Sequence, residues 1–157
     1  MKKFTITVAK TAGFCFGVDR AVKLVYNEIY SGCKAATLGE IIHNPTVVND
    51  LKERGVRVIS SPDEALEGER VVIRSHGAGA DVYRRLEELG IGYSDGTCPF
   101  VRRIQKIAED CSQKGMTVVI MGDSTHPEVI GIAGHGTGNA VILPDDKALS
   151  EFLKKIF

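Results

Sequence analysis

Three histidines occupy the same kind of position along the chain. His43, His76 and His126 each follow an apolar run and precede a helical pattern, in "IIHNPTVV", "IRSHGAGA" and "DSTHPEVI". In open α/β sheets, ligands bind beyond the carboxyl ends of the strands, where helix N-termini favour anions. We therefore expect these histidines to share one site. Imidazoles suit either a three-histidine zinc centre or a ring of donors around an oxyanion such as a diphosphate.

The residues around the histidines leave both kinds of site open. The chain has no H-x-H or H-x-x-x-H pair, so zinc lacks its usual local pair of ligands. In "HPE", Glu128 could serve as a proton donor if its pKa were raised, or could simply complement the helix dipole. H-x-E also opens the zinc deaminase signature, but no P-C-x-x-C follows it, which excludes that class. His135, in "GHGTGN", lacks the pattern, and we expect it to play no part in the site.

Two of the four cysteines precede helical patterns and have aromatic neighbours. Cys15 lies in "GFCFGV" and Cys98 in "DGTCPF". A helix N-terminus stabilises a thiolate, which suits a nucleophile or an iron ligand. Cys111 falls on an apolar helix face and Cys33 follows a helix end, so we expect both to be inert. Two thiolates alone do not complete an iron–sulfur cluster, which usually takes four.

Composition narrows the class of protein. The chain has 157 residues, of which 43% are hydrophobic and 25% charged, with a formal net charge of zero. This balance disfavours nucleic acid and anionic membranes as partners. No apolar run approaches the roughly 18 to 20 residues that span a bilayer, and "MKKFTITVAK" is typical of a strand rather than a signal peptide. We expect a cytoplasmic protein without disulfides.

Apolar runs alternate with helical patterns throughout, which predicts α/β units with mainly parallel sheets. The expected strands are 4–9, 35–38, 56–59, 70–75, 91–95, 117–122 and 140–143, and the expected helices are 18–32, 44–55, 61–66, 81–90, 99–115, 126–136 and 145–157. The longest helix places Val101, Ile104, Ala108 and Cys111 on one face. The repeated strand–histidine–helix pattern suggests related, three-layer-like subdomains around a shared central site.

Five motifs carry a resemblance to a known family. In order, "GFCFGVDRAV", "GEIIHNPTVV", "VVIRSHGAG", "DGTCPFV" and "GDSTHPEVIG" resemble the LytB-type 4-hydroxy-3-methylbut-2-enyl diphosphate reductases, over residues 4–135. The resemblance implies three α/β subdomains around a [4Fe–4S] cluster. It also implies reductive removal of an allylic hydroxyl to give isopentenyl and dimethylallyl diphosphates, with a ferredoxin or flavodoxin as electron donor.

The resemblance assigns roles to individual residues. Cys15 and Cys98 resemble the first two of three cluster ligands. His43, His76 and His126 resemble the diphosphate-binding histidines, with His126 also near the proton path. Glu128 resembles the carboxylate that delivers the proton.

The chain departs from the family at its downstream end. The family's third cysteine, and the threonine, serine and asparagine residues that line its pocket, lie beyond the residues present here. We therefore expect an N-terminal portion, inactive alone, with a strand and lead-in at 1–12, one subdomain at 13–97, a truncated second at 98–157 and no third. The alternative is a zinc-binding or non-catalytic anion-binding module built on the three histidines.

Overall fold

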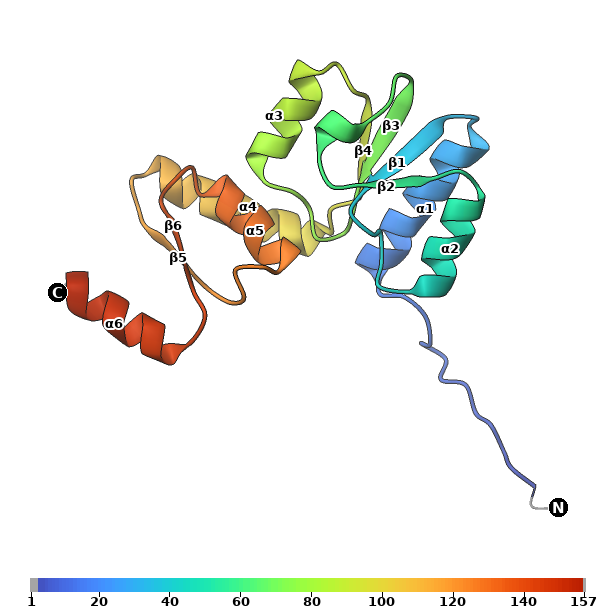
Figure 1. Ribbon diagram of the computed structural model, residues 1–157. Coiled ribbons are helices and arrows are strands. Elements are labelled where there is room, and N and C mark those ends of the chain that lie inside the picture. Colours follow the sequence, from blue (N-terminus) through green and yellow to red (C-terminus); the bar gives the residue numbers. More distant parts are fainter. Residues whose placement is uncertain (1–2, 157) are drawn as a thin grey trace.

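Short apolar runs separated by capped helices give this chain two parallel sheets (Figure 1). The computed structural model describes residues 3–156. The elements in chain order are α1 (Phe16–Tyr30), β1 (Lys34–Leu38), α2 (Pro45–Glu53), β2 (Arg57–Ile59), the 3-10 helix η1 (Pro62–Glu64), β3 (Glu69–Ile73), α3 (Ala80–Glu88), β4 (Tyr93–Asp95), α4 (Pro99–Gln113), β5 (Val118–Met121), α5 (Pro127–His135), β6 (Ala140–Leu143) and α6 (Asp146–Ile156). The expected α/β class with mainly parallel sheets is confirmed.

The larger sheet has four strands in the order β2-β1-β3-β4, all parallel. Side chains alternate between its faces: Val72 packs with α1 and α2 on one face, and Val71 and Ile73 pack with α3 on the other. The buried cluster on the first face contains Ala21, Val22, Val25, Ala35, Ile41, Leu51, Val56 and Val72, and that on the second contains Ala36, Ile59, Val71, Ile73, Ala78 and Leu86. The result is the expected helix–sheet–helix layering, which Figure 1 shows around β1 and β3.

Local signals set the helix starts at the carboxyl edge of this sheet. Asn44 caps α2 by accepting hydrogen bonds from the Thr46 and Val47 amides at 3.0 and 3.4 Å. Pro45 then occupies the first turn, where its missing N–H costs no hydrogen bond. The cap holds α2 immediately after His43.

The second sheet consists of β5 and β6, paired in parallel, with α4, α5 and α6 around it. Its buried apolar side chains are few, namely Val101, Ala108, Ile132 and Leu143. The two sheets lie before and after residue 98, and the division of the chain at 97/98 stays a prediction.

The expectation of a strand at residues 4–9 is wrong. Residues 4–9 form no strand: Phe4, Ile6 and Val8 are 86%, 87% and 75% exposed, and no neighbouring strand pairs with this extended segment within residues 3–156. Alternation of apolar residues makes a strand only where another strand supplies hydrogen bonds. The last expected helix residue, Phe157, lies outside the described residues.

The buried face of α4 also differs from the expected one. Gln105 and Ser112 are buried beside Val101 and Ala108, whereas Ile104 is 44% exposed and Cys111 is only half-buried. The Ser112 hydroxyl donates a hydrogen bond to the Gly136 carbonyl at 2.6 Å, so its burial leaves no unsatisfied hydroxyl. Along residues 3–156 no helix is long and apolar enough to cross a membrane.

Candidate iron and diphosphate site

The two candidate ligand cysteines begin two different helices. Helix α1 starts two residues earlier than the sequence indicated, so Cys15 is its N-cap residue, and Cys98 is the N-cap residue of α4. Neither thiol makes a side-chain capping hydrogen bond; Cys15 is exposed and Cys98 partly exposed. Each cysteine therefore lies at a helix N-terminus, the positive end of the helix dipole.

A glycine brings these two helix starts together. A Cβ placed on Gly17 would lie 2.8 Å from the Cys98 Sγ and 2.9 Å from the Cys98 Cβ. The Cys98 side chain thus packs directly against the first turn of α1, two residues from Cys15. Cys15 and Cys98 therefore begin adjoining helices, and their role as ligands stays a prediction.

The three histidines also converge. The ring centroids of His43 and His76 lie 6.2 Å apart, and those of His76 and His126 lie 5.6 Å apart. One histidine follows β1, one follows β3 and one is the N-cap residue of α5, as the sequence indicated. The thiol and histidine groups are joined through the backbone, because the Cys98 amide donates to the Ser75 carbonyl at 2.9 Å, one residue before His76.

His76 lies between the rings of the other two histidines and is partly buried. Desolvation by burial, followed by the positive charge of Arg74, holds the pKa of His76 below its ordinary value of 6.5. Its Nδ1 is buried and makes no hydrogen bond within residues 3–156. This ring is therefore neutral at neutral pH, and a neutral imidazole can donate from one of its ring nitrogens.

We predict that His76 titrates below the ordinary histidine pKa of 6.5. In an NMR titration, its ring signals should change with a midpoint below pH 6.5. Arg74→Gln should raise that midpoint, because it removes a nearby positive charge. Because the folded state resists protonation of His76, its contribution to the free energy of unfolding should decline as the pH falls from 6.5 to the folded pKa. His76→Gln should remove that pH dependence. A midpoint at or above 6.5 would contradict this assignment.

His126 and Glu128 are linked at the start of α5. The Glu128 amide donates to the His126 Nδ1 at 3.2 Å. Because Nδ1 accepts, neutral His126 carries its proton on Nε2, which leaves an N–H donor for a ligand. His126 is exposed and Glu128 half-buried. Both residues therefore lie at the N-terminus of α5, and a proton-donor role for Glu128 stays a prediction.

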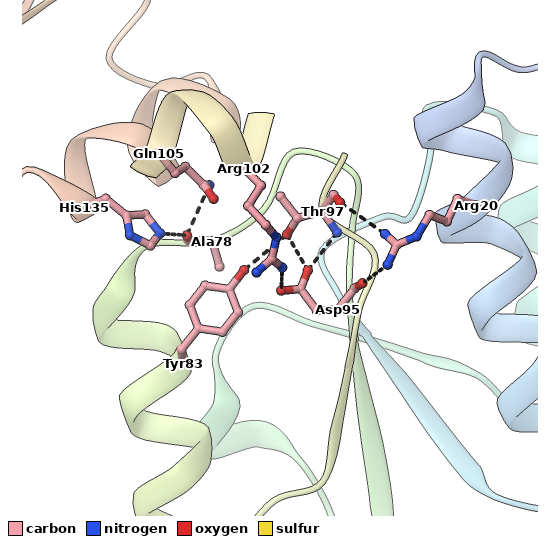
Figure 2. Close-up of polar contacts among 8 residues, drawn as sticks. All are labelled: Arg20, Ala78, Tyr83, Asp95, Thr97, Arg102, Gln105 and His135. Atoms are coloured by element: carbon pink, nitrogen blue, oxygen red, sulfur yellow. Dashed lines mark hydrogen bonds and ion pairs between the residues drawn. The ribbon is translucent and has the colours of Figure 1, made fainter. Parts of the chain in front are cut away.

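Two residues near this site were not expected from the sequence. His135 contacts the Ala78 carbonyl through Nε2 at 3.2 Å, and Gln105 donates to the same carbonyl at 3.5 Å (Figure 2). Both therefore hold the loop after His76 against helices α4 and α5. Gln105 falls at helical spacing from buried Val101 and Ala108, but its polarity concealed its burial. His135 had been expected to have no role in the site.

The donor set bears on which metal it could hold. No group of three or more His, Cys, Asp or Glu side chains within residues 3–156 is arranged to hold a metal ion. Two cysteine thiols at adjoining helix starts are of the ligand type that iron–sulfur clusters use, and their role as ligands stays a prediction.

Comparison with known proteins decides the family. The family model described as LytB protein matches residues 6–156, almost the whole chain. The chain belongs to the LytB protein family. The motifs that carried the resemblance lie within this match, and the family identified from the sequence is confirmed.

LytB relatives are similar over most of this chain. It is 48% identical over 142 residues to the 4-hydroxy-3-methylbut-2-enyl diphosphate reductase of Caldanaerobacter subterraneus subsp. tengcongensis, covering 88% of this chain and 49% of the relative. It is 39% identical over 142 residues to that of Geobacter sp. (strain M21), covering 90% and 50%. The chain thus spans about half the length of the curated relatives that it matches.

Two solved structures share the fold. One is a structure of (E)-4-hydroxy-3-methyl-but-2-enyl diphosphate reductase, called the terminal enzyme of the non-mevalonate pathway; it is 40% identical, with a TM-score of 0.80, covering 95% of this chain and 54% of that one. The other is the Plasmodium falciparum reductase, at 21% identity and a TM-score of 0.84, covering 90% and 45%. The second likeness concerns the fold alone.

Proposed function

We propose that this chain supplies two iron ligands and the diphosphate-binding histidines of a 4-hydroxy-3-methylbut-2-enyl diphosphate reductase. The observation that carries the proposal is the packing of the Cys98 Sγ against the first turn of α1, with 2.8 Å between that sulfur and a Cβ placed on Gly17. The three histidines lie close to this contact, because the Cys98 amide donates to the Ser75 carbonyl, one residue before His76. The relatives that share most of this chain carry the name of this reductase.

Cys15 and Cys98 would hold two irons of a [4Fe–4S] cluster. Both thiolates lie at helix N-termini, and the absence of a side chain on Gly17 leaves room for the Cys98 sulfur. The relatives are about twice as long as this chain. The remaining ligands would come from the part of the protein that corresponds to their additional length. When bound, the cluster would deliver electrons and present a Lewis-acidic iron to the substrate.

The histidines would bind the diphosphate of the substrate. His126 offers an Nε2–H donor and His43 is exposed, while His76 lies between them as a neutral ring. Donors from three separate loops can contact different diphosphate oxygens, which orients the other end of the substrate. The N-terminus of α5 adds a favourable dipole to the same anion.

Glu128 would hold the proton that leaves with the hydroxyl group. In the overall reaction two electrons and two protons replace the C–O bond by a C–H bond and release water, so a proton donor must lie near the hydroxyl. Glu128 is half-buried and follows the histidine that binds the anion. A ferredoxin or flavodoxin would supply the electrons.

Glu128→Gln should slow this reaction strongly while leaving substrate binding nearly unchanged. We expect product formation by the full-length gene product, with a chemical reductant, to fall about 100-fold or more, the scale of a lost general acid. Binding of the diphosphate should stay within about two-fold, because the histidines are unchanged. Exposed Glu151→Gln, on α6, is the matched control.

A second function stays open, in which the chain is an anion-binding module whose thiols have no role. Diphosphate binding that requires the histidines, with no iron in the full-length protein and no turnover, would favour it.

Full activity of Glu128→Gln would contradict the proton-donor role.

A further inference from the structure

We propose that Arg20 is a positioning residue, which fixes the separation of the Cys15 and Cys98 sulfurs and places a positive charge beside the iron they hold. This inference rests on the proposed function where it concerns iron. Its geometric part concerns only the two thiols and can be tested without iron.

Arg20 joins the helix of one cysteine to the loop of the other. From α1, its Nη1 donates to the Thr97 carbonyl at 3.1 Å and its Nη2 donates to the Asp95 carbonyl at 3.0 Å. Figure 2 shows these two hydrogen bonds, which join α1 to the residues immediately before Cys98. Because the guanidinium is planar, both carbonyls are held at once and the loop cannot rotate about a single hydrogen bond.

Residues 95–97, to which Arg20 donates, are also held by their own hydrogen bonds and by close packing. The Asp95 carboxylate accepts hydrogen bonds from the Thr97 amide at 2.8 Å and from the Thr97 hydroxyl, and it pairs with Arg102 on α4. Between them, a Cβ on Gly96 would lie 2.4 Å from the Ile73 carbonyl oxygen and 3.0 Å from the Ala21 Cβ. A displacement of α1 would therefore be passed to Cys98 rather than absorbed by the loop.

The charge of Arg20 is uncompensated. Its partners are neutral carbonyls, and it forms no ion pair within the described chain. The adjacent carboxylates are engaged elsewhere, since Asp19 pairs with Lys23 and the Asp95 carboxylate pairs with Arg102. Arg20 is half-buried and lies about one helical turn beyond Gly17, against which the Cys98 sulfur packs. A positive charge there offsets the negative charge of bound thiolates.

Two substitutions separate geometry from charge. Arg20→Lys keeps the charge but cannot grip both carbonyls in one plane, whereas Arg20→Gln loses both properties. Exposed Arg84→Gln, on α3, is the matched control because it removes one arginine that has no hydrogen bond or ion pair with residues 95–97. Circular dichroism of each variant verifies that it is folded.

The first readout is cross-linking of Cys15 to Cys98 by dibromobimane in the iron-free chain, with Cys33 and Cys111 replaced by serine. We expect both Arg20 variants to cross-link several-fold more slowly than Arg84→Gln. Cross-linking at the control rate in Arg20→Gln would overturn the positioning role. The same slowing in a protein that binds no iron would leave this role intact and refute the proposed function instead.

The second readout is the iron-loaded full-length protein. Loss of iron to a chelator should be about ten-fold faster in both Arg20 variants, as for other residues that orient metal ligands. The midpoint potential should fall in Arg20→Gln, because the added electron loses a neighbouring positive charge, and should stay unchanged in Arg20→Lys. Equal potentials in Arg20→Gln and the control would overturn the electrostatic role.

Discussion

Gly17→Ala should lower the iron content of the full-length protein while leaving the chain folded. The added methyl group would meet the Cys98 Sγ at 2.8 Å and its Cβ at 2.9 Å, so Cys98 or the first turn of α1 must move. Alanine is otherwise favoured over glycine in a helix by up to about 1 kcal/mol, which offsets part of the strain. We expect iron content to fall by about ten-fold or more, as for a misplaced metal ligand.

Gly131→Ala is the matched control for this change. It also adds a methyl group to a helical glycine, but the nearest atom to its Cβ would be the Gln105 side-chain nitrogen at 3.3 Å, which would have to shift by only a few tenths of an ångström. We expect this variant to retain its iron, measured together with Gly17→Ala after anaerobic purification. Full iron content in Gly17→Ala would show that the close approach of Cys98 to α1 does not matter for the metal.

Gly134→Ala should weaken diphosphate binding by separating the histidines. A Cβ on Gly134, in α5, would lie 2.7 Å from the Gly79 Cα, and backbone cannot rotate away as a side chain can. Helix α5 would have to shift from the loop that carries His76, and His126 would move with it. Loss of one hydrogen bond to the charged diphosphate costs about 1.5–3 kcal/mol, so we expect affinity for the diphosphate to fall by about ten-fold or more.

The same Gly131→Ala variant serves here, because Gly131 lies one turn earlier on α5 and its Cβ would sit 3.5 Å from the His76 carbonyl oxygen, an ordinary contact. Calorimetric titration with inorganic diphosphate measures both variants. Unfolding by urea shows how much of any loss reflects stability. Wild-type affinity in Gly134→Ala would contradict a binding site assembled between His76 and His126.

The sequence is informative about this site where the signal is local. A histidine between an apolar run and a proline or glycine is readable as a strand-to-helix loop, and parallel strands place such loops at one edge. His43, His76 and His126 were grouped in this way, and the structure brings their rings together. Cysteine before a helical pattern is an equally local signal.

The contacts that assemble the site are not local. Arg20 reaches carbonyls 75 and 77 residues away, and a carbonyl carries no sequence signature. Gln105 is buried on a face where apolar spacing favoured Ile104. Residues 4–9 have a strand pattern, yet pairing depends on a neighbouring strand that no local pattern reveals. Glycines such as Gly17 and Gly134 matter because of what lies opposite them, which the sequence does not show.

Iron and acid-labile sulfide content, measured in the anaerobically purified full-length gene product and its cysteine variants, tests the central claim most directly. The account predicts about four iron and four sulfide per chain in the wild type. It predicts near-complete loss in Cys15→Ser and Cys98→Ser, with normal content in Cys33→Ser and Cys111→Ser. Retention of iron in both Cys15→Ser and Cys98→Ser, or stoichiometric zinc with no iron in the wild type, would contradict it.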